Sequence, residues 1–125
     1  MKKILLVAAL VMAASPALAN VPTLSGGIGE EEQAQIEQAQ GQYNLKVLFA
    51  GVNGDYLSDI TYTVRNSTGD IMTHGISKGP YLLLKLPAGS YAFEADYDGQ
   101  VKSQKFSVKD AGLKKLDFRF RQDQP

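Results

Sequence analysis

The 125-residue sequence contains no cysteine and only one histidine, His74. Without cysteine the chain has no disulfide and no thiolate nucleophile, so packing alone must stabilise the fold. A nucleophilic triad needs a histidine base that a third group orients, whereas a lone histidine is typical of an ordinary strand or turn position. We therefore expect no enzyme, and no catalytic, cofactor-binding or metal-binding residue.

Long hydrophobic runs are also scarce. The one such run, Ile4 to Ala14, has eleven residues, about half of what a membrane-spanning helix needs. Lys2 and Lys3 precede it, and Ala17-Leu18-Ala19 fits a small-x-small cleavage site. This layout is typical of a secretory signal peptide. We expect residues 1–19 to be removed, a periplasmic or secreted location, no lipid anchor and no membrane span after cleavage.

Neither sign of charge dominates the sequence. The whole chain has 13 basic and 13 acidic residues, and removal of Lys2 and Lys3 leaves a net charge of about −2. This balance gives no case for binding nucleic acid. The remaining chain, residues 20–125, has the length of one domain, and no cofactor is expected.

What the sequence does contain divides it into unequal parts. Residues 20–43 are rich in Gly, Gln and Glu and carry four glutamates without a lysine or arginine, and residues 122–125 are a short C-terminal tail. In residues 44–121, apolar-alternating runs recur every 10 to 14 residues between turn signals. Such spacing predicts an all-β sandwich. Seven strands are expected, at residues 44–50, 56–66, 70–76, 80–86, 90–98, 101–108 and 114–120.

The alternation of apolar residues predicts which side chains point inward. The inward set is Leu45, Val47, Phe49, Ile60, Tyr62, Val64, Leu82, Leu84, Leu86, Tyr91, Phe93, Ala95, Tyr97, Phe106, Val108, Leu116, Phe118 and Phe120. A two-residue Asp98-Gly99 turn is expected to pair Tyr97 with Gln100. Val101 then falls on the outer face or at a bulge. The run at residues 70–76 has no clear phase.

The stretch SGGIGEEEQAQIEQ at residues 25–38 superficially resembles a phosphate-binding loop. The glycine spacing does not fit a dinucleotide fingerprint, and no Gly-Lys-Ser/Thr follows. Glu30, Glu31 and Glu32 fall in the first turn of a helix expected over residues 30 to about 40, where carboxylates complement the helix dipole and repel phosphate. We expect a short, loosely tethered helix that docks, if at all, only weakly and by charge on the last two strands. Their outward basic residues are Lys105, Lys109, Lys115, Arg119 and Arg121.

Two further motifs have ordinary explanations. Asp96-Tyr97-Asp98-Gly99 lacks the glutamate that a calcium loop needs six residues after its glycine, because that position is Lys105. Asn66-Ser67-Thr68 matches a glycosylation sequon but is typical of a turn. Both segments are interpreted as turns.

One stretch resembles a known family. Leu86-Pro87-Ala88-Gly89-Ser90-Tyr91 is similar to the LPxGxY motif of the carboxypeptidase regulatory-like domain, and the similarity covers about residues 44–120. It implies a seven-stranded transthyretin-like (prealbumin-like) β-sandwich, here with a short N-terminal helix, in which Tyr91 directs its hydroxyl back to the turn. A purine-pathway hydrolase shares that fold, but its several histidines and C-terminal Tyr-Arg-Gly-Ser are missing here. The resemblance therefore implies no such activity.

These observations predict a non-enzymatic periplasmic or secreted β-sandwich module that binds a protein or glycan partner of the envelope. The alternative is a structural or accessory subunit of an envelope assembly. The sequence leaves the partner, the oligomeric state and the docking of the helix open.

Overall fold

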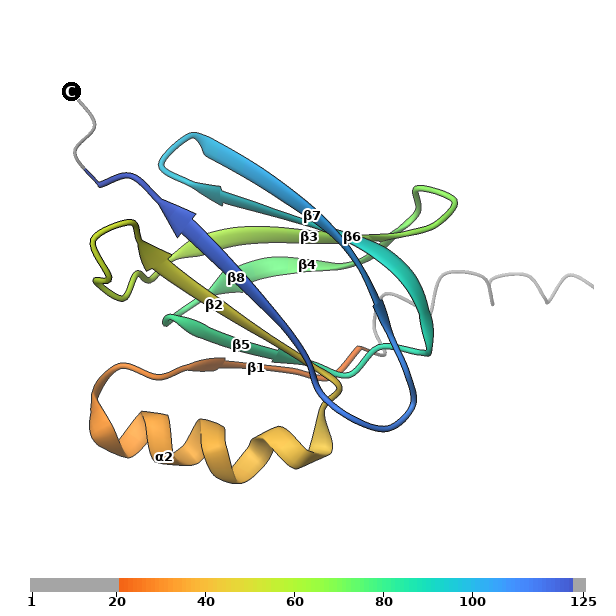
Figure 1. The fold of residues 1–125 in the computed structure, drawn as a ribbon, viewed down its shortest axis with the longest axis horizontal. Helices are drawn as coiled ribbons and strands as arrows, with labels where there is room; N and C mark the ends of the chain where they lie inside the picture. The colour runs from red at the N-terminus through yellow and green to blue at the C-terminus, as the bar shows by residue number, and fades with distance from the viewer. Residues whose placement is uncertain (1–20, 123–125) are drawn as a thin grey trace, which may run out of the picture.

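The computed structural model describes residues 21–122, so the predicted signal peptide and residues 123–125 lie outside the described part of the chain. It contains one short helix, a 3₁₀ turn and eight strands, arranged as two four-stranded sheets (Figure 1). The first sheet has the order β1-β5-β2-β8 and the second the order β4-β3-β6-β7. In chain order the elements are β1 (Thr23–Gly26), α2 (Gly29–Ala39), η2 (Gln40–Gln42), β2 (Leu45–Gly51), β3 (Ile60–Asn66), β4 (Ile71–Ser77), β5 (Tyr81–Leu84), β6 (Gly89–Tyr97), β7 (Gln100–Val108) and β8 (Lys114–Phe120).

All seven expected strands are present, as β2 to β8. The structure also has an eighth strand, β1, which the sequence did not predict. The additional strand, β1, pairs antiparallel with β5 through residues 23–26. Its sequence, TLSG, has one large apolar residue and a glycine. A four-residue strand of this kind has almost no local signal, because its pairing with β5 lies about 60 residues away along the chain. The N-terminal segment therefore contributes a strand to the first sheet.

The core lies between the two sheets and follows the predicted inward phases. Seventeen of the eighteen predicted inward residues are buried, and Tyr97 is partly buried against them. Aromatic rings occupy the centre: Phe93 of the second sheet lies 5.3 Å from Phe118 and 6.1 Å from Phe49, measured between ring centroids. Offset aromatic contacts of this kind add to the free energy gained by burial.

The β6–β7 hairpin agrees with its predicted turn. Tyr97 pairs with Gln100, and Asp98 and Gly99 both have positive φ angles, 53° and 86°. Those angles are the ones that a two-residue type I′ turn requires. Val101 is 55% exposed, as its outward phase predicted.

At the start of β6, Tyr91 directs its hydroxyl back to the preceding turn, as the motif predicted. The Tyr91 hydroxyl donates a hydrogen bond to the carbonyl oxygen of Pro87, four residues upstream. The ring of Tyr91 stacks on Phe106 inside the core. The bond fixes the turn that leads into β6.

β4 has no simple phase because it contains a bulge. Val64 pairs with Thr73, and the next residue of β3, Arg65, pairs with Ile71, so Met72 is an extra residue in β4. A bulge lets two successive side chains face the same side. Met72 and Thr73 accordingly both pack inward, while Ile71 before the bulge and His74 and Ile76 after it are exposed.

Helix α2 begins and ends close to the predicted bounds, but its docking site differs from the expectation. It packs against β1, along the first sheet (Figure 1), and not on the outward faces of the last two strands. Its one large apolar residue, Ile36, is only 3% exposed. Leu83, on the outward phase of β5, is fully buried. Apolar contact therefore docks the helix, and α2 covers part of the first sheet's outer face.

No helix in residues 21–122 is both long and apolar enough to cross a membrane.

Candidate binding face

Two tyrosines and a lysine form a cluster on the outer side of the first sheet. Lys46 lies on β2 and Tyr81 on the neighbouring strand β5. Leu48 pairs with Tyr81, and Lys46 is two residues from Leu48 on the same face of β2, so Lys46 and Tyr81 are neighbours. The Lys46 ammonium lies 4.9 Å from the centre of the Tyr81 ring and donates a hydrogen bond to Gln40 Oε1 beyond the end of α2. The Tyr56 ring meets Tyr81 edge-on at 5.8 Å, and their hydroxyl oxygens are 3.3 Å apart.

Beside this cluster is a cavity of about 200 Å³. It is lined by Lys46, Leu48, Tyr81, Lys115, Leu116 and Asp117. Asp117 forms an ion pair with Arg119 at 2.7 Å, two residues along β8 on the same face. We call the surface made by Lys46, Tyr56, Tyr81, Lys115 and Asp117 the Tyr81 face.

The Tyr81 hydroxyl is held in its protonated form. Its hydrogen bond with Tyr56, its partial burial and nearby negative charges raise the pKa of Tyr81 to about 12. The face therefore presents a neutral hydroxyl even well above neutral pH, beside two lysines, Lys46 and Lys115, and one carboxylate, Asp117.

The glycine-rich loop supports the Tyr81 face and is not arranged as a phosphate-binding loop. The backbone N–H groups of Gly27 and Ile28 both donate to Glu32 Oε1, at 3.2 Å and 3.1 Å. These amides precede α2, where a bound phosphate would need its donors. A carboxylate from the helix itself already accepts both hydrogen bonds, which agrees with the sequence-based argument against phosphate.

Gly27 is required by a close contact with Tyr81. It is buried, with φ at +103°, and a Cβ atom at this position would lie 2.5 Å from Cδ2 of the Tyr81 ring. The loop can therefore approach the ring only through a residue without a side chain.

Replacing Gly27 with alanine is expected to destabilise the protein by about 1–3 kcal/mol, because the methyl group overlaps the Tyr81 ring and the φ angle becomes strained. Urea unfolding of the two proteins measures this difference. Gly41→Ala is the matched control: nothing lies within 4 Å of its Cβ position, so we expect a change below about 1 kcal/mol. Equal midpoints for the two variants would contradict the close approach.

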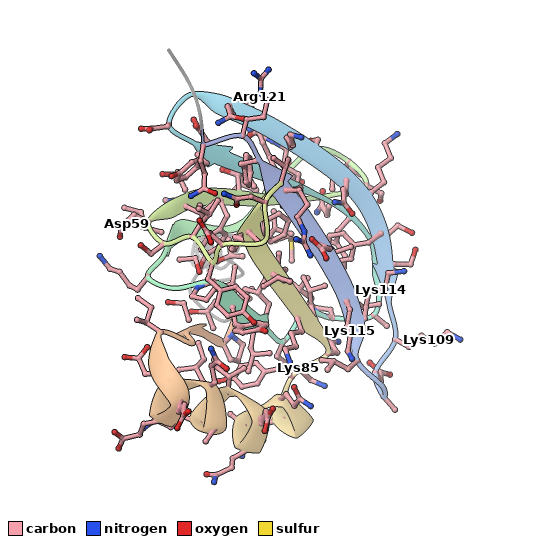
Figure 2. All side chains as sticks on the ribbon, turned by 60° about the vertical axis from the view of Figure 1, so that its left-hand side comes forward. Asp59, Lys85, Lys109, Lys114, Lys115 and Arg121 are labelled. Carbon is pink, nitrogen blue, oxygen red and sulfur yellow. The ribbon has the colours of Figure 1, made fainter. Side chains whose placement is uncertain are left out.

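A basic end adjoins the Tyr81 face. Figure 2 shows Lys85, Lys109, Lys114 and Lys115 toward the same end of the sandwich, with Arg121 at the other end. Buried Asn44 joins the chain segments that carry these lysines, because it bonds to Leu86, Lys109 and Lys114. Its side-chain amide donates to the carbonyl oxygens of Leu86 and Lys109, at 2.7 Å and 3.0 Å, and its backbone carbonyl accepts from the Lys114 amide.

The residues that the sequence singled out lie elsewhere, in ordinary structural positions. His74 is exposed on β4 opposite Thr63. Asp96 accepts a hydrogen bond from the Gly99 amide in the β6–β7 turn, and Asn66 accepts from Thr68 and Asp70 in the β3–β4 turn. Across residues 21–122, no group of three or more His, Cys, Asp or Glu side chains could hold a metal ion.

The five outward basic residues of the last two strands do not form one surface. β7 belongs to the second sheet and β8 to the first, so Lys105 lies on one outer side of the sandwich, and Lys115 and Arg119 lie on the other. Lys109 follows β7 at the basic end, and Arg121 is at the opposite end. The outward basic residues of β7 and β8 therefore do not offer a helix one continuous surface.

The Tyr81 face has almost no local signal in the sequence. Lys46 and Tyr81 have outward phases in their strands, but outward residues on a sheet are usually just solvated. Tyr56 follows β2 and meets the sheet only through a bridge to Ala50. Tyr56 and Tyr81 are 25 residues apart in the sequence, so only the sheet order shows that they lie together.

Comparison with known proteins shows the family. Residues 42–118 match the model of the Rhizobiales growth-associated tandem repeat domain. The match covers more than half of the chain and runs from the end of η2 into β8, so β1 and α2 lie outside it. No curated protein matches the sequence. The chain belongs to the Rhizobiales growth-associated tandem repeat domain family.

Proposed function

We propose that this chain is an exported, non-enzymatic binding module that holds a carboxylate-bearing partner, an acidic protein segment or an acidic glycan, on the Tyr81 face. The observation that carries the proposal is the cluster of Lys46, Tyr56 and Tyr81 beside a cavity of about 200 Å³. The non-enzymatic role rests on the sequence, which offers no nucleophile with an oriented base.

The chemistry of the face favours an anionic ligand with some apolar character. Lys46 and Lys115 supply two cations at the cavity rim, and Leu48, on the outward phase of β2, supplies apolar lining. The Tyr81 hydroxyl stays protonated and is available as a hydrogen-bond donor or acceptor. Asp117 is already paired with Arg119, so its charge is partly compensated.

The basic end extends the same preference. Lys85, Lys109 and Lys114 lie near Lys115 (Figure 2), so a ligand longer than the cavity meets further positive charge. Cations gathered at one place steer an anionic partner and raise its association rate. Each exposed charge pair contributes at most about 1 kcal/mol, so affinity depends on several contacts together.

The finer assignment of the fold is also part of the proposal. We take the sandwich to be transthyretin-like and similar to the carboxypeptidase regulatory-like domain. Its support is the two four-stranded sheets and the hydrogen bond from Tyr91 to Pro87 within the LPxGxY motif. In such modules, sheet faces and loop tips contact partners while the core supplies rigidity.

Binding is tested by titrating the mature chain, residues 20–125, with a labelled oligoglutamate peptide and with an oligogalacturonate. A neutral maltooligosaccharide is the control ligand. We expect one of the two acidic ligands to bind, with affinity falling as salt rises. The ligand that binds distinguishes an acidic protein partner from an acidic glycan.

Charge reversal then locates the site. Lys115→Glu is expected to weaken binding about tenfold, which corresponds to about 1.4 kcal/mol. Lys105→Glu is the matched control, because Lys105 is an exposed lysine on the outer face of the second sheet, and little change is expected. Absence of binding to either acidic ligand, or equal effects of the two variants, would contradict this function and favour the structural or accessory role.

Export is a separate prediction. The basic start, the eleven-residue apolar run and Ala17-Leu18-Ala19 predict a mature N-terminus at Asn20. Mass spectrometry of the protein from the envelope fraction measures this end directly. Full-length protein that retains Met1 in the membrane fraction would show that residues 1–19 are not a cleaved signal.

A further inference from the structure

The two sheets have four edge strands, β1, β8, β4 and β7, and three of these edges are protected. An unprotected edge is a template for pairing with another strand. β1 has only four residues, and short edge strands are one form of protection. β7 and β8 are bridged to one another: Gln104 Nε2 donates to the carbonyl oxygen of Asp117, and the Gln100 side chain bonds both the amide and the carbonyl of Arg121.

β4 lacks these protections over most of its length. Its seven residues, IMTHGIS, include no Asp, Glu, Lys, Arg or Pro. Ile76 is 52% exposed and Ile71 is 38% exposed. The bulge at Met72 disturbs only one end, so residues 73–77 form a regular edge of five residues.

We propose that two copies of this chain pair through β4, antiparallel to one another, and so join their second sheets into one eight-stranded sheet. Antiparallel pairing of identical strands is two-fold symmetric, so each copy uses the same surface. Centred near Gly75, it places Ile76 of one copy opposite His74 of the other and covers apolar surface that is exposed in the single chain.

The charges at the two ends of β4 select this partner and this direction. Asp70 immediately precedes the strand and Lys78 immediately follows it, and both are exposed. Antiparallel pairing brings Asp70 of each copy near Lys78 of the other, whereas parallel pairing would bring like charges together. Within residues 21–122 neither side chain forms an ion pair. The strand is thus complementary in charge to its own reversed copy.

The expected dimer is weak. Pairing of two five-residue strands buries far less than the roughly 1,200–2,000 Å² of a standard stable interface. We therefore expect a dissociation constant on the order of micromolar to millimolar. The β4 edge belongs to the second sheet, away from the Tyr81 face, so pairing leaves that face open in both copies. The inference does not depend on the proposed ligand.

Sedimentation velocity of residues 20–125 from about 10 μM to 1 mM tests the inference. We expect a monomer–dimer equilibrium that Ile76→Lys shifts at least tenfold toward monomer, because an outward lysine on an edge strand disfavours pairing. Val101→Lys is the matched control: Val101 is 55% exposed on β7, the opposite edge of the same sheet, and no shift is expected. Circular dichroism melts check that each variant is folded.

A charge swap tests the direction of pairing. Lys78→Asp alone is expected to weaken the dimer, since two carboxylates then meet at each end. The double variant Asp70→Lys with Lys78→Asp restores opposite charges and is expected to recover it. A protein that stays monomeric at 1 mM, a dimer unaffected by Ile76→Lys, or a double variant no stronger than Lys78→Asp would overturn the antiparallel β4 pairing.

Discussion

Replacing Asn44 with alanine is expected to lower the free energy of unfolding by about 3 kcal/mol or more. Asn44 is 1% exposed, and its side chain makes three hydrogen bonds: to the amide and carbonyl of Leu86 and to the carbonyl of Lys109. The substitution leaves these groups without that partner, and each buried unsatisfied group costs about 1–3 kcal/mol. The loss affects the β5–β6 and β7–β8 connections together.

Equilibrium denaturation in urea measures this loss. Asn53→Ala is the control, because Asn53 is exposed and its hydrogen bonds are to Asp55, two residues away; we expect a change within about 0.5 kcal/mol. Asn44→Asp should also destabilise, since a carboxylate accepts from the Leu86 amide but repels the two carbonyl oxygens. A mild effect of Asn44→Ala, close to that of Asn53→Ala, would show that the three bonds contribute little.

Truncation of Phe93 to alanine is expected to cost about 3–5 kcal/mol. The side chain is fully buried and lies at the centre of the aromatic cluster, within 6.1 Å of the ring centroids of Phe49, Tyr62 and Phe118. Removing the ring leaves a cavity between two sheets, and rigid sheets close such a space only in part.

His74→Ala is the comparison for Phe93→Ala. His74 is exposed on β4, so the expected change is within about 0.5 kcal/mol. Chemical denaturation at low micromolar protein concentration keeps any pairing of chains from affecting the result. If His74→Ala were the more destabilising of the two, the assignment of inward and outward phases would be wrong.

Alternation predicted most of the sandwich because it is a local signal. A strand such as β8, with Leu116, Phe118 and Phe120 inward, shows its buried face within seven residues. The Asp98-Gly99 turn was predictable for the same reason, since turn chemistry depends on neighbouring residues. Two features escaped this reasoning: β1, which is defined by distant pairing with β5, and the phase of β4, which the bulge at Met72 interrupts.

The docking of α2 was wrongly predicted because charge was weighed above one apolar residue. Four glutamates suggested attraction to basic strands, yet Ile36 is 3% exposed and the helix lies along β1. Burying one isoleucine contributes about 1.5–3 kcal/mol, which exceeds an exposed ion pair at no more than about 1 kcal/mol. That the helix would lie along β1 could not be known before the sheet order.

The Tyr81 face depended on topology in the same way. Lys46, Tyr81 and Lys115 are separated by 34 or more residues in sequence and meet because β2 pairs with both β5 and β8. The parallel pairing of β2 with β8 also separates Lys115 from Lys105, which the sequence had placed together. Outward phase alone identifies exposed residues but not which of the two outer faces they share.

The most direct test of the Tyr81 face is a nuclear magnetic resonance titration of the mature chain with the acidic ligand. Amide signals report which part of the surface the ligand contacts. We predict that saturable shifts fall on Lys46, Leu48, Tyr81 and Lys115, while Thr63, Glu94 and Ser103 on the outer face of the second sheet stay unchanged. Shifts confined to the second sheet, or no shifts at any ligand concentration, would contradict the assignment of this face as the binding surface.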